Sequence, residues 1–419
     1  MLEVEEVVGW VNAKRKLGGI IFIELIPRSS LKPLTVVVKR DNSGLWEVAK
    51  KLKLGSAIRV KGEKVSGGIS KRGEEFKPSE IIEVACPSES IPVDPLLKAG
   101  VTLDTLIRYR YLMLRNPKIR AVFKIRALLL KYAREYLESE GFLEVNTPKL
   151  CGAGAEGGAE VFELDYFGRK AYLAQSPQLY KQMLMAGLPK VYEITPYFRA
   201  EKHHTTRHLN ESWGIDAEMG FIRGVDDVMR LLEGLISYIL GELSKKAKEE
   251  LNALGVEVEP PVIPFKRVTY DEVLKLLKEE GLVLRWGEDL THEAERKLGE
   301  IMKEKGYELY FIINYPWEAK PFYIMKEGRL SKSFDLDYKG LEIASGGQRE
   351  HRFNELIKNM REKGLNVEDF GFYLEAFKYG MPPHGGFGLG VERLLMSLLN
   401  LSNVREAILF PRDIQRLIP

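Results

Sequence analysis

A change of hydrophobic pattern along the 419-residue chain constrains the fold most strongly. Residues 1–90 hold short runs rich in β-formers, separated by Gly and Asn turn signals. From Ala121 the apolar residues instead recur at helical spacing, until Gly141 ends the segment. Since one hydrophobic core rarely serves more than about 250–300 residues, the change marks a domain boundary. We predict three parts, with a small domain at 1–90, a linker at 91–118 and a large domain at 119–419.

The first 90 residues predict a small β-barrel. Short β-rich runs occupy residues 7–10, 20–26, 34–38, 57–60 and 80–84, and one helical segment lies at 45–54. Five short strands and a helix favour a closed barrel of the oligonucleotide-binding (OB) type, with an SH3-like barrel as the alternative. Pro87, Pro92 and Pro95 lie at the boundary with the linker that follows, and residues 99–114 are partly helical in pattern.

The large domain mixes strands and helices in irregular order. Strand-like runs occupy residues 145–147, 161–164, 171–174, 191–197, 309–315, 322–326 and 333–343. Helical runs occupy residues 226–251, 270–280, 291–305, 350–363 and 367–377, before a final Gly-rich strand-to-helix turn. Irregular interleaving favours an α+β fold on an antiparallel sheet over a regular parallel α/β fold.

Composition excludes several protein classes. The two cysteines, Cys86 and Cys151, cannot build a disulfide scaffold and lack metal-ligand spacing. The acidic start MLEVEEVVGW is unlike a signal peptide, and the most apolar helical stretch carries Glu233 and Glu242 and is too short to span a bilayer. A net charge of +3 excludes a polycation. We expect a cytoplasmic protein that does not enter membranes.

Rare polar residues gather in a few strings. Four of the five glutamines lie in AQSPQLYKQ and SGGQRE, and most histidines lie in or beside similar strings. His203, His204 and His208 have some ligand spacing, but neither HExxH nor paired cysteines accompany them, so zinc is not predicted. The clustering favours a shared polar pocket over scattered surface loops.

Three of these strings carry a family resemblance. GFLEVNTPKL (141–150), FRAEKHHTTRHLNE (198–211) and GFGLGVERLLMSLL (386–399) resemble, in this order, the three motifs of class II aminoacyl-tRNA synthetases. The strings AEGGAEVF, AQSPQLYKQM, FDLDYKGLEIASGGQREHR and YGMPPHGGFGLG resemble the aspartyl branch in its shorter archaeal form. The resemblance runs from about residue 116 to the end and is looser over residues 1–90.

The resemblance implies ATP-dependent attachment of L-aspartate to tRNA through an aspartyl-adenylate, with release of AMP and pyrophosphate. A carboxylate is already ionised at pH 7, so the first step needs orientation and neutralised phosphate charge rather than a general base. By resemblance, Arg199 holds the α-phosphate and Arg393 the γ-phosphate, as the two catalytic residues. Glu342 and Ser345 hold Mg²⁺. The remaining implied ATP-binding residues are Glu201, Arg207, His208, Leu209, Gly390, Val391 and Glu392, together with Glu342.

Selection of aspartate requires cations in the pocket. Lys181 and Arg349 match the positions that hold the aspartate side chain in the family, and asparagine would leave both charges unpaired. The resemblance also implies that Glu156, Ser176 and Gln178 lie beside the ammonium and main-chain groups. Arg199 and Ser345 complete this implied aspartate site.

The resemblance further implies a tRNA partner and a homodimer. Phe22 falls where the barrel of the family stacks an anticodon base, although the following stretch IELIPRSSLKPL lacks the glutamine usual there. The helix at 121–141 and the strand at 145–147 form the dimer interface in the family.

Four alternatives stay open at this point. The pattern does not choose between tRNA(Asp) alone and both tRNA(Asp) and tRNA(Asn). An asparaginyl-tRNA synthetase is disfavoured by Lys181 and the GGQRE string. An adenylate-forming asparagine synthetase is disfavoured by the barrel, and a non-catalytic RNA-binding paralogue by the presence of Arg199, Arg393 and Glu342.

Overall fold

The computed structural model describes residues 4–68, 74–97, 100–152, 160–202 and 205–419. These residues form two compact units. The first comprises Met1–Ile125 with Lys248–Val256, and the second comprises Arg126–Ala247 with Glu257–Pro419.

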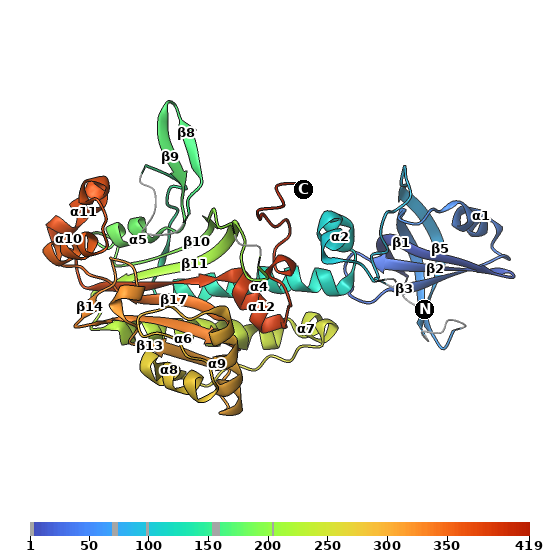
Figure 1. Cartoon of the computed structure of the whole chain (residues 1–419). Coiled ribbons are helices and arrows are strands. Elements are labelled where there is room, and N and C mark those ends of the chain that lie inside the picture. The colour runs from blue at the N-terminus through green and yellow to red at the C-terminus, as the bar shows by residue number, and fades with distance from the viewer. Residues whose placement is uncertain (1–3, 69–73, 98–99, 153–159, 203–204) are drawn as a thin grey trace. The chain divides into compact units, whose positions relative to one another are not determined.

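The N-terminal strands close into a barrel (Figure 1). Its strands are β1 (Glu5–Leu17), β2 (Ile20–Pro27), β3 (Leu34–Lys39), β4 (Ala57–Ser66) and β5 (Glu74–Ala85), in the order β1-β2-β3-β5-β4. Helix α1 (Ser43–Lys51) connects β3 to β4. The prediction of a five-stranded OB-type barrel with one helix is confirmed. The strands extend beyond their predicted bounds because apolar side chains mark only the part that faces the core.

The second unit is built on an eight-stranded sheet of order β12-β13-β16-β17-β18-β11-β10-β6. Every inner pair is antiparallel, and one parallel pair lies at each edge. The predicted α+β fold on an antiparallel sheet is therefore confirmed. In sheet order, the strands are β12 (Lys266–Thr269), β13 (Leu309–Ile313), β16 (Ser333–Tyr338), β17 (Glu342–Gln348), β18 (His384–Gly390), β11 (Glu211–Gly220), β10 (Lys190–Phe198) and β6 (Leu143–Glu144).

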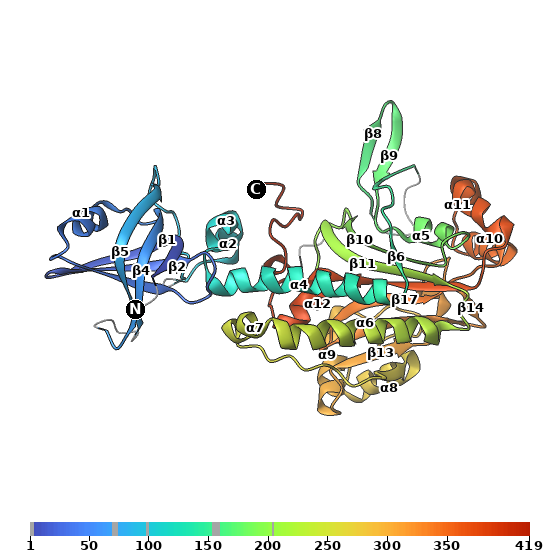
Figure 2. The ribbon, with the colours of Figure 1, turned by 180° about the vertical axis from the view of Figure 1, so that it is seen from behind.

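Long helices support the sheet. Helices α6 (Val225–Lys246) and α12 (Val391–Leu399) contact β17 and β18. Figure 2 shows α6 beside α4 (Pro117–Ser139), where the Tyr136 ring lies 5.6 Å from that of Tyr238. A Cβ at Gly234 would overlap the Tyr136 hydroxyl, so this glycine permits the close approach of the two helices.

Shorter elements complete the chain. A three-stranded sheet of order β7-β9-β8 projects from the second unit (Figure 1). Its strands are β7 (Leu150–Cys151), β8 (Glu163–Tyr166) and β9 (Arg169–Leu173). The remaining helices are α2 (Leu103–Arg108), α3 (Arg110–Met113), α5 (Gln178–Leu184), α7 (Lys248–Leu254), α8 (Tyr270–Glu279), α9 (His292–Glu304), α10 (Phe353–Glu362) and α11 (Gly371–Glu375). The remaining strands are β14 (Lys326–Glu327) and β15 (Leu330–Ser331).

Some predicted bounds are wrong. The strand expected at 145–147 ends as β6 at Glu144, although the Val145 amide still donates to Tyr192 O. In the run at 322–326, Phe322 and Tyr323 form a turn, Ile324 makes an isolated bridge to Arg349, and only Lys326 belongs to a strand. The two aromatic residues pack in a core with α10 and α11. The helix expected at 226–251 breaks at Ala247 into α6 and α7. A buried apolar run such as 322–326 has no period that separates a strand from a packed turn, which explains that error. None of the described helices is long and apolar enough to cross a membrane.

Candidate active site

A cavity of about 400 Å³ lies on the central sheet of the second unit. Strands β10, β11, β17 and β18, the segment after β10 and the starts of α5 and α12 contribute to its wall. The predicted site residues that line it are Ser176, Gln178, Arg199, Glu201, Arg207, His208, Leu209, Glu342, Ser345, Arg349, Gly390, Glu392 and Arg393. Lys181 and Val391 are buried behind this wall, and Glu156 lies outside the described residues. Segments almost 220 residues apart thus converge on one cavity.

Three arginines, Arg199, Arg207 and Arg393, line the cavity. Arg199 is partly exposed, and its Nη1 lies 3.9 Å from Glu201 Oε1. Asn210 holds the backbone of this segment, because its Nδ2 donates to Arg199 O at 2.7 Å and to Glu201 O at 3.0 Å. Arg393 enters from the first turn of α12, and its Nη1 donates to Glu342 O at 3.1 Å. Forked guanidinium groups in this arrangement suit phosphate oxygens.

Arg207 is held by a residue outside the predicted motifs. Its Nη1 donates to Glu295 Oε2 at 2.5 Å, and its Nη2 donates to Gly340 O at 3.3 Å. Burial, and then the neighbouring Glu342, raise the pKa of Glu295 to about 7. Glu295 lies on α9, whose helical spacing was predicted, but no sequence signal linked it to Arg207 across 88 positions.

Acidic residues gather beside the arginines. Glu342 and Ser345 lie on β17, and Asp335 faces Ser345 from β16. Asp335 Oδ2 accepts a hydrogen bond from Lys320 Nζ at 2.7 Å. Its Oδ1 is buried without a partner among the described residues. Burial and the charge of Asp335 raise the pKa of Glu342.

These oxygens suit Mg²⁺, a hard cation that prefers oxygen ligands. A cation would satisfy the orphaned Asp335 oxygen and relieve the repulsion on Glu342. Within the part of the chain that the structure describes, no three His, Cys, Asp or Glu side chains form a metal site by themselves. A bound ion would therefore share its remaining coordination positions with substrate phosphate or water.

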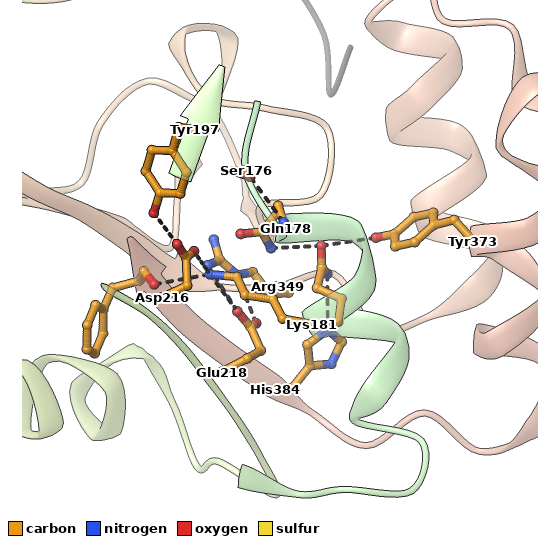
Figure 3. Close-up of polar contacts among 11 residues, drawn as sticks. Ser176, Gln178, Lys181, Tyr197, Asp216, Glu218, Arg349, Tyr373 and His384 are labelled. Atoms are coloured by element: carbon orange, nitrogen blue, oxygen red, sulfur yellow. Dashed lines mark hydrogen bonds and ion pairs between the residues drawn. The ribbon is translucent and has the colours of Figure 1, made fainter. Parts of the chain in front are cut away.

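Four buried charged side chains, Lys181, Asp216, Glu218 and Arg349, lie together in the site (Figure 3). Lys181 Nζ donates to Asp216 Oδ1 at 2.9 Å and to Phe387 O at 3.1 Å, and lies 3.3 Å from Glu218 Oε2. Arg349 binds Glu218 through Nε and Nη2, at 3.0 and 3.3 Å. Burial opposes ionisation of Glu218, but Arg349 and Lys181 outweigh it and lower its pKa. The two cations and two anions, each at most 3% exposed, sum to zero charge.

The structure separates the two cations. Arg349 lines the cavity, and its Nη1 has no hydrogen-bond partner among the described residues, so it is available to a ligand. Lys181 lies one layer deeper and is fully engaged. Tyr197 donates its hydroxyl to Asp216 Oδ2 and thereby orients this acid.

Comparison with known proteins agrees with this geometry. Residues 102–414 match the family model described as tRNA synthetases class II (D, K and N). The chain belongs to this family. It is 49% identical to the aspartate–tRNA(Asp) ligase of Pyrococcus horikoshii, over 99% of this chain and 96% of the relative. It is 48% identical to the aspartate–tRNA(Asp/Asn) ligase of Methanopyrus kandleri, over 100% of this chain and 96% of the relative.

Solved structures extend the similarity to the whole fold. The asparaginyl-tRNA synthetase of Pyrococcus horikoshii, complexed with asparaginyl-adenylate, superposes with a TM-score of 0.89 at 34% identity. The match covers 100% of this chain and 96% of that chain. The family resemblance read from the three motifs, and the implied aspartyl branch, are confirmed.

Residues of this class II synthetase that sequence reasoning missed are mostly buried acids. Asp216 and Glu218 lie two positions apart on β11 and so point to the same face of the sheet, and Asp335 lies on β16. The only indication in the sequence was the presence of acidic residues within strands that are otherwise mostly apolar. Without knowledge of the strand order, the sequence does not show which cationic side chain such an acid contacts.

In the barrel, Phe22 lies on the outer side of β2. Its neighbours Ile21 and Ile23 point into the core, whereas Phe22 is only partly buried. Register places it between Arg15 on β1 and Val37 on β3. An outward aromatic beside a cation suits base stacking, so the role expected of Phe22 stays a prediction.

Proposed function

We propose that this class II synthetase is an aspartate–tRNA ligase. It joins L-aspartate to the α-phosphate of ATP, releases pyrophosphate, and transfers the aspartyl group to the 3′-terminal adenosine of tRNA with release of AMP. The observation that carries the proposal is one cavity lined by Arg199, Arg207 and Arg393 and also by Arg349, whose Nη1 has no hydrogen-bond partner among the described residues.

In the first step, the amino acid carboxylate attacks the α-phosphorus. Arg199 binds the α-phosphate and Arg393 the γ-phosphate, and both favour the charge that develops as pyrophosphate leaves. Arg207, His208 and Leu209 shape the adenine end with Glu201, while Gly390, Val391 and Glu392 form the turn that presents Arg393. When bound at Glu342 and Ser345, with Asp335 beside them, Mg²⁺ neutralises phosphate charge.

Aspartate specificity follows from charge pairing. The side-chain carboxylate of aspartate pairs with Arg349 Nη1, while Lys181 offsets the charge of Asp216 and Glu218, which would otherwise repel an anion. Asparagine would leave the Arg349 donor without a charged partner, a costly mismatch in a closed site. Ser176 and Gln178 lie at the cavity wall, where the ammonium group of the substrate would lie.

The remaining assignments complete the proposal. The barrel binds the tRNA anticodon with Phe22 as a stacking surface, residues 91–118 link it to the catalytic domain at 119–419, and α4 pairs with that of a second copy. Charging of tRNA supplies translation, so we place the activity in the cytoplasm. The relatives named above include both tRNA(Asp) and tRNA(Asp/Asn) ligases.

Aminoacylation of separate tRNA(Asp) and tRNA(Asn) transcripts with aspartate and with asparagine tests the proposal. We expect aspartate to be attached to tRNA(Asp). Attachment of aspartate to tRNA(Asn) as well would group the chain with the tRNA(Asp/Asn) ligases, and its absence with the tRNA(Asp) ligases. Attachment of asparagine instead would identify an asparaginyl-tRNA synthetase. Aspartate-dependent exchange of pyrophosphate into ATP without charging of either transcript would indicate another acceptor.

A further inference from the structure

A chain of buried hydrogen bonds lies behind the amino acid end of the cavity. Gln178, at the start of α5, lines the cavity, and its Nε2 donates to Gln182 Oε1 at 2.9 Å. Tyr373 donates to the same oxygen at 3.2 Å, and Gln182 Nε2 lies 3.1 Å from His384 Nε2. Figure 3 shows Gln178, Tyr373 and His384 at the three ends of this network.

The direction of every bond in the network follows from one backbone carbonyl together with the burial of His384. His384 Nδ1 lies 2.8 Å from Pro382 O, which can only accept, so Nδ1 carries a proton. His384 is completely buried, and this burial lowers its pKa to about 4. The ring is therefore neutral at pH 7, and its Nε2 must accept.

The amide of Gln182 is oriented as a result. Its nitrogen must face His384, so its oxygen faces Gln178 and Tyr373. Gln178 must in turn direct its own nitrogen toward Gln182. Its oxygen then faces the cavity and has no partner among the described residues.

We propose that His384 and Gln182 are positioning residues that hold the Gln178 amide oxygen toward the cavity, where it accepts a hydrogen bond from the α-ammonium group of the substrate. The inference deepens the proposed function and depends on it. An amide with the opposite orientation would present two N–H donors to a cation and lose a charge-assisted hydrogen bond. The network thus favours α-amino acids over dicarboxylates without an amino group.

Succinate is the matched probe, because it has the two carboxylates of aspartate and lacks the ammonium group. Binding of aspartate and of succinate to the full-length protein is measured by calorimetry, and KM values for aspartate and ATP by pyrophosphate exchange. For Gln182→Met, which removes the polar link at similar volume, we expect the Kd of aspartate to rise about tenfold. The Kd of succinate and the KM of ATP should change less than twofold.

His384→Asn is the second variant, because its short amide can still donate to Pro382 O but cannot reach Gln182. The same selective loss is expected. Tyr373→Phe leaves the bond between Gln182 and His384 intact, so its aspartate-to-succinate ratio should stay within about threefold of wild type. Asn359→Leu is the control, since this buried amide donates to Phe322 O outside the network.

An equal loss of aspartate and succinate binding in Gln182→Met would overturn the inference, because it would show a general structural role. Unchanged affinity for both ligands in Gln182→Met would also overturn it. If His384→Asn does not fold, Gln182→Met decides. Failure of the proposed function is a separate result, since wild-type protein would then show no aspartate-dependent exchange at all.

Discussion

Replacement of Lys181 by methionine tests the charge balance of the amino acid end most directly. In the wild type, Lys181 and Arg349 offset Asp216 and Glu218, for a sum of zero. Without Lys181 the cluster carries −1, and bound aspartate would raise this to −2. Methionine keeps most of the side-chain volume, so the charge is the main change.

The magnitude follows from burial. Lys181 and its two acidic partners are at most 3% exposed, and loss of one member of such a pair costs about 3–5 kcal/mol. Part of this cost appears as lower stability, and part as repulsion of the anionic substrate. One further charge at about 5 Å and an effective dielectric constant of about 20 gives about 3 kcal/mol. We therefore expect kcat/KM for aspartate to fall by a factor on the order of 100.

Pyrophosphate exchange at varied aspartate and asparagine concentrations is the assay, with thermal unfolding measured alongside. The side chain of asparagine is neutral, so we expect kcat/KM for asparagine, which is low in the wild type, to fall less than tenfold. The ratio of kcat/KM for aspartate to that for asparagine should therefore decrease. Lys149→Met is the matched control, because Lys149 pairs with the buried Glu193 at 2.8 Å outside the cavity lining. A folded Lys181→Met enzyme with near wild-type use of aspartate would refute the charge-balance reasoning.

Three further outcomes are expected. Arg393→Lys keeps the charge but loses the fork, so the KM for ATP in pyrophosphate exchange should rise at least tenfold, while calorimetric aspartate binding stays unchanged. Phe22→Ala should raise the KM for tRNA about tenfold and leave pyrophosphate exchange unaltered, and an effect on exchange would contradict the barrel assignment. The pKa of His384 is 6.5 in the unfolded chain and about 4 in the folded chain. Between these two pH values the unfolded chain binds a proton that the folded chain does not. The free energy of unfolding therefore falls as the pH decreases through this range, by up to about 3 kcal/mol. Urea unfolding from pH 7 to 4.5 should show a shallower decline in His384→Asn than in wild type.

Local pattern was sufficient for much of the fold. Helix α9 follows from apolar residues at helical spacing, and the barrel strands follow from β-rich runs between turn residues. The motif strings also located Arg199 and Arg393, because these arginines lie in short segments whose letters are read together. Period and turn chemistry depend on neighbours within a few positions, and a single chain displays them directly.

Partnerships between distant positions required the tertiary structure. Glu295 meets Arg207, Asp335 faces Ser345 across two strands, and His384 reaches Gln182 only because β18 and α5 lie together. In the linear sequence these are polar residues within helices or strands, and nothing near them in the chain identifies the residue that each one contacts. Strand order and register decide which buried charges meet, and both are set by burial of the whole core. The sequence by itself therefore determined the family and identified Arg199 and Arg393 as candidate site residues, while only the fold decided how Lys181 and Gln178 are held.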